Sequence, residues 1–179
     1  MPRAYKMSRR GWIASGLSIA TLAALPGRLL ANANLQKIKG DAMTALTPYL
    51  LFDGRCREAM EFYQSCFAGE LTLTKVKDSP AKDRMPAFQQ DQVLHARLRS
   101  PNVEISASDW LRLDRTPVRG NTVCLYLSGG KFQDLKALFE SLSRDADVTD
   151  PLSEQFFGVY GALNDKFGVR WMFQTNKND

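Results

Sequence analysis

Residues 46–67, LTPYLLFDGRCREAMEFYQSCF, hold the two patterns that decide the fold class. The apolar run at 46–53 has a proline near its start, and it predicts a short strand that ends at the turn signal Asp53-Gly54. Apolar residues then recur at helical spacing from residue 55 to residue 67, at Cys56, Ala59, Met60, Tyr63, Cys66 and Phe67. The stretch therefore predicts a strand followed by an amphipathic helix that packs its apolar stripe into a core.

The rest of the chain repeats this architecture. After the first helix, the sequence predicts strands at 71–76, 92–99 and 103–107, with a polar loop at 77–90. A connector at 109–120 leads to a second set: a strand at 122–127, a helix at 131–143, and strands at 147–152, 156–163 and 169–175. The order βαβββ occurs twice, so we expect an α+β fold of two βαβββ modules.

Five short segments carry a resemblance to a known family. They are LTPYLLFDG at 46–54, AMEFY at 59–63, QVLHA at 92–96, ASD at 107–109 and DKFGVRWM at 165–172. In this order they resemble the PhnB-like branch of the vicinal-oxygen-chelate (glyoxalase/bleomycin-resistance) superfamily, from residue 46 to about residue 174. The resemblance implies that the two modules form a curled mixed sheet around a cleft, and that the protein is a homodimer.

The first 43 residues differ from the rest. Arg9-Arg10 precedes a moderately apolar run at 13–25, and Ala31-Asn32-Ala33 fits a small-residue cleavage site. Residues 1–33 thus resemble a twin-arginine export signal, residues 34–43 a linker, and residues 44–179 the domain, which predicts a periplasmic protein. The alternative is that translation starts at Met43, which predicts a cytoplasmic one. The apolar run is too short for stable membrane insertion, which takes about 20 residues.

The basic excess of the chain also belongs to this segment. Of 24 Lys and Arg residues, seven lie in residues 1–43 together with one acidic residue, which leaves 17 basic and 18 acidic residues for the domain. The domain is close to neutral, so nucleic acid is not expected as a partner.

Strand alternation predicts which side chains line the cleft. In each strand the apolar set should face the helices and the other set the cleft. The predicted lining is His95, Arg97, Glu104, Ser106, Thr122, Cys124, Tyr126, Arg170, Met172 and Gln174, with Leu50 and Phe52 from the first strand. Asp109, next to Trp110, is a further candidate ligand contact, or else part of a turn with an anchoring aromatic. This mixed lining suits a small ligand with hydrogen-bonding groups.

Two lining residues are candidates for catalysis. His95 is the single histidine and could act as a general base oriented by Glu104. The alternative is a strand histidine that is hydrogen-bonded to a neighbour and takes part in no chemistry.

The resemblance also implies where a metal would bind. Metal-dependent relatives place His, Gln or Glu ligands at the positions of Pro48, residues 122–124 and Met172. A proline and a methionine do not supply the oxygen or imidazole donors that such ions prefer. We therefore expect neither a metal nor another cofactor, although the sequence does not exclude a divalent metal.

The cysteine and glycine patterns exclude further classes of function. Cys56, Cys66 and Cys124 have no zinc-site spacing, and each is expected to be a small buried apolar residue. Gly129-Gly130 lacks the further glycine of a nucleotide-binding loop, which disfavours methyl transfer. Two hypotheses remain: a metal-free protein that binds a small molecule, and a glyoxalase- or dioxygenase-type enzyme (lyase or oxidoreductase) with atypical metal ligands or His95 as base. The missing ligands favour the first.

Overall fold

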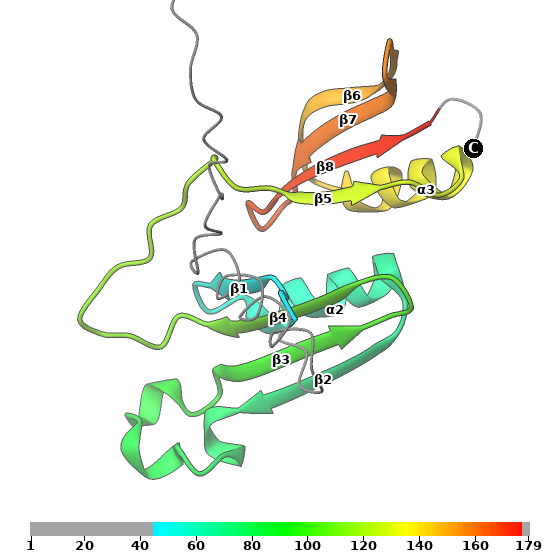
Figure 1. Cartoon of the computed structure of the whole chain (residues 1–179). Coiled ribbons are helices and arrows are strands. Elements are labelled where there is room, and N and C mark those ends of the chain that lie inside the picture. Colours follow the sequence, from blue (N-terminus) through cyan, green and yellow to red (C-terminus); the bar gives the residue numbers. More distant parts are fainter. Residues whose placement is uncertain (1–44, 177–179) are drawn as a thin grey trace, which may run out of the picture. The chain divides into compact units, whose positions relative to one another are not determined.

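The computed structural model describes residues 45–176 (Figure 1). The export signal predicted at 1–33 and the linker at 34–43 lie outside these residues. The first module contains β1 (Tyr49–Phe52), α2 (Cys56–Phe67), β2 (Glu70–Lys75), β3 (Val93–Arg99) and β4 (Glu104–Asp109). Its sheet has the strand order β1-β4-β3-β2, with β1 parallel to β4 and the other pairs antiparallel.

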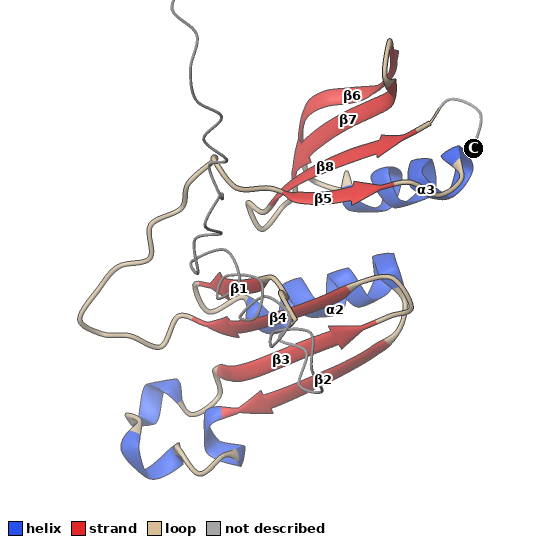
Figure 2. Ribbon diagram, in the orientation of Figure 1, coloured by secondary structure: helices blue, strands red, loops and turns tan. Residues whose placement is uncertain are grey.

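The second module repeats this topology. It contains β5 (Leu125–Ser128), α3 (Phe132–Leu142), β6 (Asp147–Gln155), β7 (Gly158–Asn164) and β8 (Arg170–Thr175). The order β5-β8-β7-β6 again places the first strand parallel to the last (Figure 2). The predicted class, α+β with two βαβββ modules, is confirmed.

Three segments differ from the prediction. The loop between β2 and β3 contains 3-10 turns at Val76–Asp78, Lys82–Arg84 and Ala87–Gln89. The strand expected at 122–127 begins only at Leu125, and Val123 is 77% exposed although it was assigned to the core. The strand expected at 156–163 begins at Gly158, because Phe156 and Phe157 form the turn between β6 and β7.

The predicted helical stripe forms the core of the first module. Cys56, Ala59, Met60 and Tyr63 are fully buried, and α2 packs on one face of the sheet. The chain then turns sharply at Gly69, where a Cβ would lie 2.3 Å from the backbone oxygen of Arg99 and φ is +103°. Only glycine fits there, so this position fixes the path from α2 into β2.

A buried carboxylate joins the two modules. Asp165, in the turn between β7 and β8, accepts hydrogen bonds from the hydroxyl of Tyr63 in α2 (2.7 Å) and from the indole N–H of Trp171 in β8 (2.8 Å). Its other oxygen accepts from the backbone N–H groups of Phe167 and Val169. Burial and the nearby Asp165 charge raise the pKa of Tyr63 well above its usual range, so this phenol stays a donor.

Within residues 45–176, no helix is both long enough and apolar enough to cross a membrane.

Candidate functional site

Each sheet has one face packed on a helix and one open face. In β3, Ala96 and Leu98 are buried while His95 and Arg97 are exposed, and in β8, Trp171 and Phe173 are buried while Met172 is only half-buried. Glu104 and Ser106 in β4 are likewise partly exposed while Ile105 and Ala107 are buried, so burial alternates along all three strands. The first open face carries Tyr49, Leu51, His95, Arg97, Glu104 and Ser106. The second open face carries Cys124, Tyr126, Arg170, Met172 and Gln174.

The prediction for β1 is wrong by one residue. Phe52 is 2% exposed and packs edge-on against Phe167 in the core, and Leu50 packs against the same core. Tyr49 and Leu51 are instead half-exposed on the first open face. Residues 49–52 are apolar on both sides of the strand, so alternation alone could not choose the face. The hydroxyl of Tyr49 could have indicated the correct face of β1, because a tyrosine hydroxyl prefers a solvent-exposed position.

His95 and Glu104 do not form the predicted pair. The Tyr49 hydroxyl lies 3.2 Å from Nδ1 of His95, and the two rings are 5.8 Å apart. Glu104 lies opposite Arg99 in the β3–β4 ladder, four residues along from His95, or about 13 Å at the rise of a strand. The orienting group next to His95 is therefore a phenol and not a carboxylate.

Glu104 is held by two arginines. It accepts hydrogen bonds from Nε of Arg97 at 3.0 Å and from Nε of Arg99 at 3.1 Å. These guanidinium groups lower the pKa of the Glu104 carboxyl, the hydrogen bond from Arg97 having the largest effect. Because the two arginines engage this carboxylate away from His95, the predicted role of Glu104 in orienting the imidazole loses its basis.

Asp109, predicted as a ligand contact, has a structural position. It is 3% exposed, and its two oxygens accept from the backbone N–H groups of Cys56 at 2.9 Å and Val93 at 2.8 Å. The first bond caps the start of α2 and the second fixes the start of β3. Neither oxygen faces a cleft.

The second open face is built around two side-chain pairs. Sγ of Cys124 lies 3.0 Å from Sδ of Met172, and the hydroxyl of Tyr126 donates a short hydrogen bond to Oε1 of Gln174. Cys124, which was expected to be buried, is only half-buried, whereas Cys56 is fully buried. Arg170 and Thr122 line a hollow of about 340 Å³ together with Cys124 and Met172.

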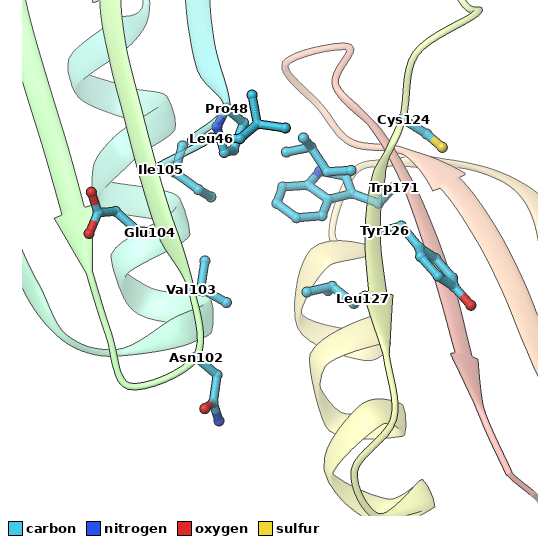
Figure 3. Close-up of a pocket in the computed structure, with 11 residues that line it drawn as sticks. Leu46, Pro48, Asn102, Val103, Glu104, Ile105, Cys124, Tyr126, Leu127 and Trp171 are labelled. Atoms are coloured by element: carbon cyan, nitrogen blue, oxygen red, sulfur yellow. The ribbon is translucent and has the colours of Figure 1, made fainter. Parts of the chain in front are cut away.

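The predicted lining residues are not gathered in one cavity. A hollow of about 360 Å³ lies between β4 and β5. Val103, Ile105, Leu127 and Trp171 point into it (Figure 3). These are side chains from the helix-facing set. Glu104, Cys124 and Tyr126 also line this hollow, but their side chains point away from the gap (Figure 3). Tyr126 and Gln174 line a separate hollow near Asn176. The alternation of residues indicated which side chains lie on the open faces. It could not show which of these side chains line the same hollow.

The residues at the metal positions do not fit a hard divalent ion. Pro48 has no side-chain donor, Met172 supplies only a thioether, and residues 122–124 supply a hydroxyl and a thiol but no carboxylate or imidazole. In the described part of the chain, no three or more His, Cys, Asp or Glu side chains are grouped so as to hold a metal ion.

Comparison with known proteins agrees with this architecture. Residues 44–174 match the family described as 3-demethylubiquinone-9 3-methyltransferase. Protein YjdN of Escherichia coli K12 is 29% identical over 143 residues, which cover 74% of this chain and 95% of that protein.

Two solved structures extend the comparison. Protein PA1353 of Pseudomonas aeruginosa is 32% identical with a TM-score of 0.64, and the match covers 74% of this chain and 98% of that one. The PhnB protein of Bacillus cereus shares the fold at 24% identity and a TM-score of 0.59, over 74% and 99% of the two chains. The chain thus belongs to the 3-demethylubiquinone-9 3-methyltransferase family, the PhnB-like branch of the vicinal-oxygen-chelate superfamily.

Proposed function

We propose that this protein binds a small molecule on the open faces of its sheets and does so without the superfamily's usual metal centre. The open faces offer hydrogen-bonding groups at Tyr49, His95, Tyr126 and Gln174, next to apolar surface. Such a mixture suits a ligand that is partly apolar and carries a few polar groups.

The donor set supports the metal-free part of the proposal. Pro48 and Met172 stand where a divalent ion would need oxygen or nitrogen ligands. The description of the family names a methyltransferase, but Gly129-Gly130 is followed by Lys131 and lacks the further glycine of a nucleotide-binding loop. Binding is therefore the better-supported function.

A homodimer is part of the proposal. Among residues 45–176, strands β1 and β5 each pair with one neighbour only, so both sheets end in a strand edge with pairing capacity. Apolar side chains, among them Leu46 and Leu127, line the hollow between β4 and β5. A second copy would cover this surface, and light scattering coupled to size-exclusion chromatography should give twice the mass of the chain.

A thermal-shift screen with the full chain in excess chelator tests the proposal. A true ligand should raise the melting temperature with chelator present, because no divalent ion is needed. His95→Ala and Tyr126→Phe should weaken binding of that ligand in calorimetry, whereas Lys136→Ala, on the exposed side of α3, should not. Binding that disappears on chelation, or that ignores both open-face substitutions, would contradict the proposal.

Catalysis with His95 as general base is the second candidate function. The observation that favours it is the contact between Tyr49 and His95, since a hydroxyl at 3.2 Å can orient the imidazole ring. An enzyme should lose turnover of a bound compound in His95→Gln, while a binding protein should lose affinity alone. Following the compound by mass spectrometry separates the two.

We also propose that residues 1–33 direct export to the periplasm. Replacing Arg9 and Arg10 by lysine should keep the protein in the cytoplasmic fraction of bacterial cells, because twin-arginine signals are read through this pair. Equal periplasmic recovery of both proteins would contradict the proposal.

A further inference from the structure

Two sulfur atoms of different chemistry meet on the second open face. Cys124 directly precedes β5, and Met172 lies in the middle of β8, which pairs in parallel with β5. Their sulfur atoms are 3.0 Å apart, and both side chains are half-buried at the wall of the same hollow. A thiol and a thioether are thus presented together at a surface that small solutes can reach.

A thiolate and a thioether are the soft donors that proteins use for Cu(I). We propose that Cys124 and Met172 together bind one Cu(I) ion. This site is distinct in chemistry from the hard divalent centre that the superfamily uses, and it does not depend on the small-molecule binding proposed above.

The charges around the pair favour a monovalent ion. Asn121, Thr122, Val123 and Arg170 form the rest of the hollow, so it contains a fixed positive charge and no carboxylate or imidazole. A thiolate neutralises the single charge of Cu(I), whereas a divalent ion would keep a net charge beside the Arg170 guanidinium. Divalent zinc also prefers more ligands than this pair supplies.

The geometry can adapt to the ion. When an ion lies between the two sulfurs, metal–sulfur bonds of about 2.3 Å place the sulfurs about 4.6 Å apart, so the present 3.0 Å contact has to open. Met172 has three rotatable side-chain bonds, and Cys124 lies outside the regular part of β5. Rotation of these two side chains therefore suffices, without movement of the sheet.

The other two cysteines are placed differently. Cys56 is fully buried beneath α2, and burial raises the pKa of its thiol to about 12. Cys66 is half-buried and lies 3.7 Å from the guanidinium of Arg144. Cys66 supplies the matched control, because it is a half-buried thiol beside an arginine, as Cys124 is, but its contact is the arginine rather than a thioether.

The test is titration of Cu(I) into the full chain in oxygen-free buffer, in competition with a chromogenic Cu(I) chelator. The wild type and Cys66→Ser should each take one ion. Cys124→Ser and the nearly isosteric Met172→Leu should each bind Cu(I) at least about tenfold more weakly. Even replacing a residue that only contacts a metal ligand costs about tenfold or more in metal affinity. Circular dichroism should confirm that the variants fold.

X-ray absorption at the copper edge of the loaded wild type gives a second result that needs no variant. It should show sulfur neighbours only, at about 2.3 Å. Three outcomes would overturn the proposal: equal affinity of wild type and Cys124→Ser, unchanged affinity in Met172→Leu, or a copper shell of nitrogen and oxygen. Thermal shifts of the wild type by small molecules, measured with a Cu(I) chelator present, would show that the proposed binding function stands even if the copper site fails.

Discussion

The two modules share one topology and expose different chemistry. The first open face places a phenol beside an imidazole and a carboxylate between two guanidinium groups. The second open face places a thiol beside a thioether and a phenol beside an amide. Behind both faces the same alternation buries large apolar side chains such as Leu98 and Trp171. The difference teaches that the core fixes the fold of each module and leaves its open face free to specialise.

Buried carboxylates hold the two modules in place, and breaking them should give the largest effects. Asp165→Asn puts an amide N–H₂ group against two donors, from Tyr63 and Trp171, and should lower the free energy of unfolding by about 3–4 kcal/mol. Asp109→Asn conflicts with a single donor and should cost about 2 kcal/mol. Urea unfolding of both variants measures the difference, and a larger loss in Asp109→Asn would contradict this account.

Alkaline pH should weaken the core of the first module through Cys56. The buried thiol has its pKa raised from 9.0 to about 12, so the unfolded chain releases this proton first. The stability that this thiol contributes is present below pH 9.0 and is lost as pH rises towards about 12. Urea unfolding across this range should therefore show a steeper decline for the wild type than for Cys56→Ala.

Tyr63 has its pKa raised in the same direction, so part of the decline should remain in Cys56→Ala. If the free energies of unfolding of Cys56→Ala and the wild type declined in parallel with pH, the pKa of the Cys56 thiol would not be raised by folding, and the account would be contradicted.

The smallest effect is expected on the first open face. Glu104 is partly exposed, and exposed ion pairs contribute little because water screens them. Glu104→Gln should leave the urea midpoint nearly unchanged at neutral pH. The contribution of Glu104 is present above the ordinary pKa of a glutamate and disappears as pH falls through its lowered pKa, so the two proteins should converge in acid.

Asp114→Asn, which removes an ion pair with Arg112 in the connector, is the matched control for this comparison. A loss of stability in Glu104→Gln as large as that of Asp109→Asn would show that the first open face belongs to the core.

The sequence predicted those features that depend on the residue pattern within a single strand or helix. In β3 and β8 polar and apolar residues alternate, so the faces of His95 and Met172 could be assigned. In β1 both faces are apolar, and Phe52 was placed on the wrong one. The helix of the first module was located to within one residue because its apolar spacing is regular.

Partners across the fold could not be predicted. Asp109 is a structural residue because Cys56 and Val93, far away in sequence, point their N–H groups at it. The partner of His95 proved to be Tyr49 because the β1–β4–β3 pairing brings them together, and no local pattern encodes this register. The pair of Cys124 and Met172 likewise depends on the parallel pairing of β5 with β8.

The metal content of the purified protein tests the central claim most directly. The full chain would be expressed in medium supplemented with zinc, iron, manganese and nickel, and analysed for all four elements. We predict far less than one such ion per chain, because Pro48 and Met172 replace the ligands that a divalent ion requires. A near-stoichiometric content of any of the four would contradict the claim that the usual divalent metal centre is missing, and it would favour an enzyme with unusual ligands.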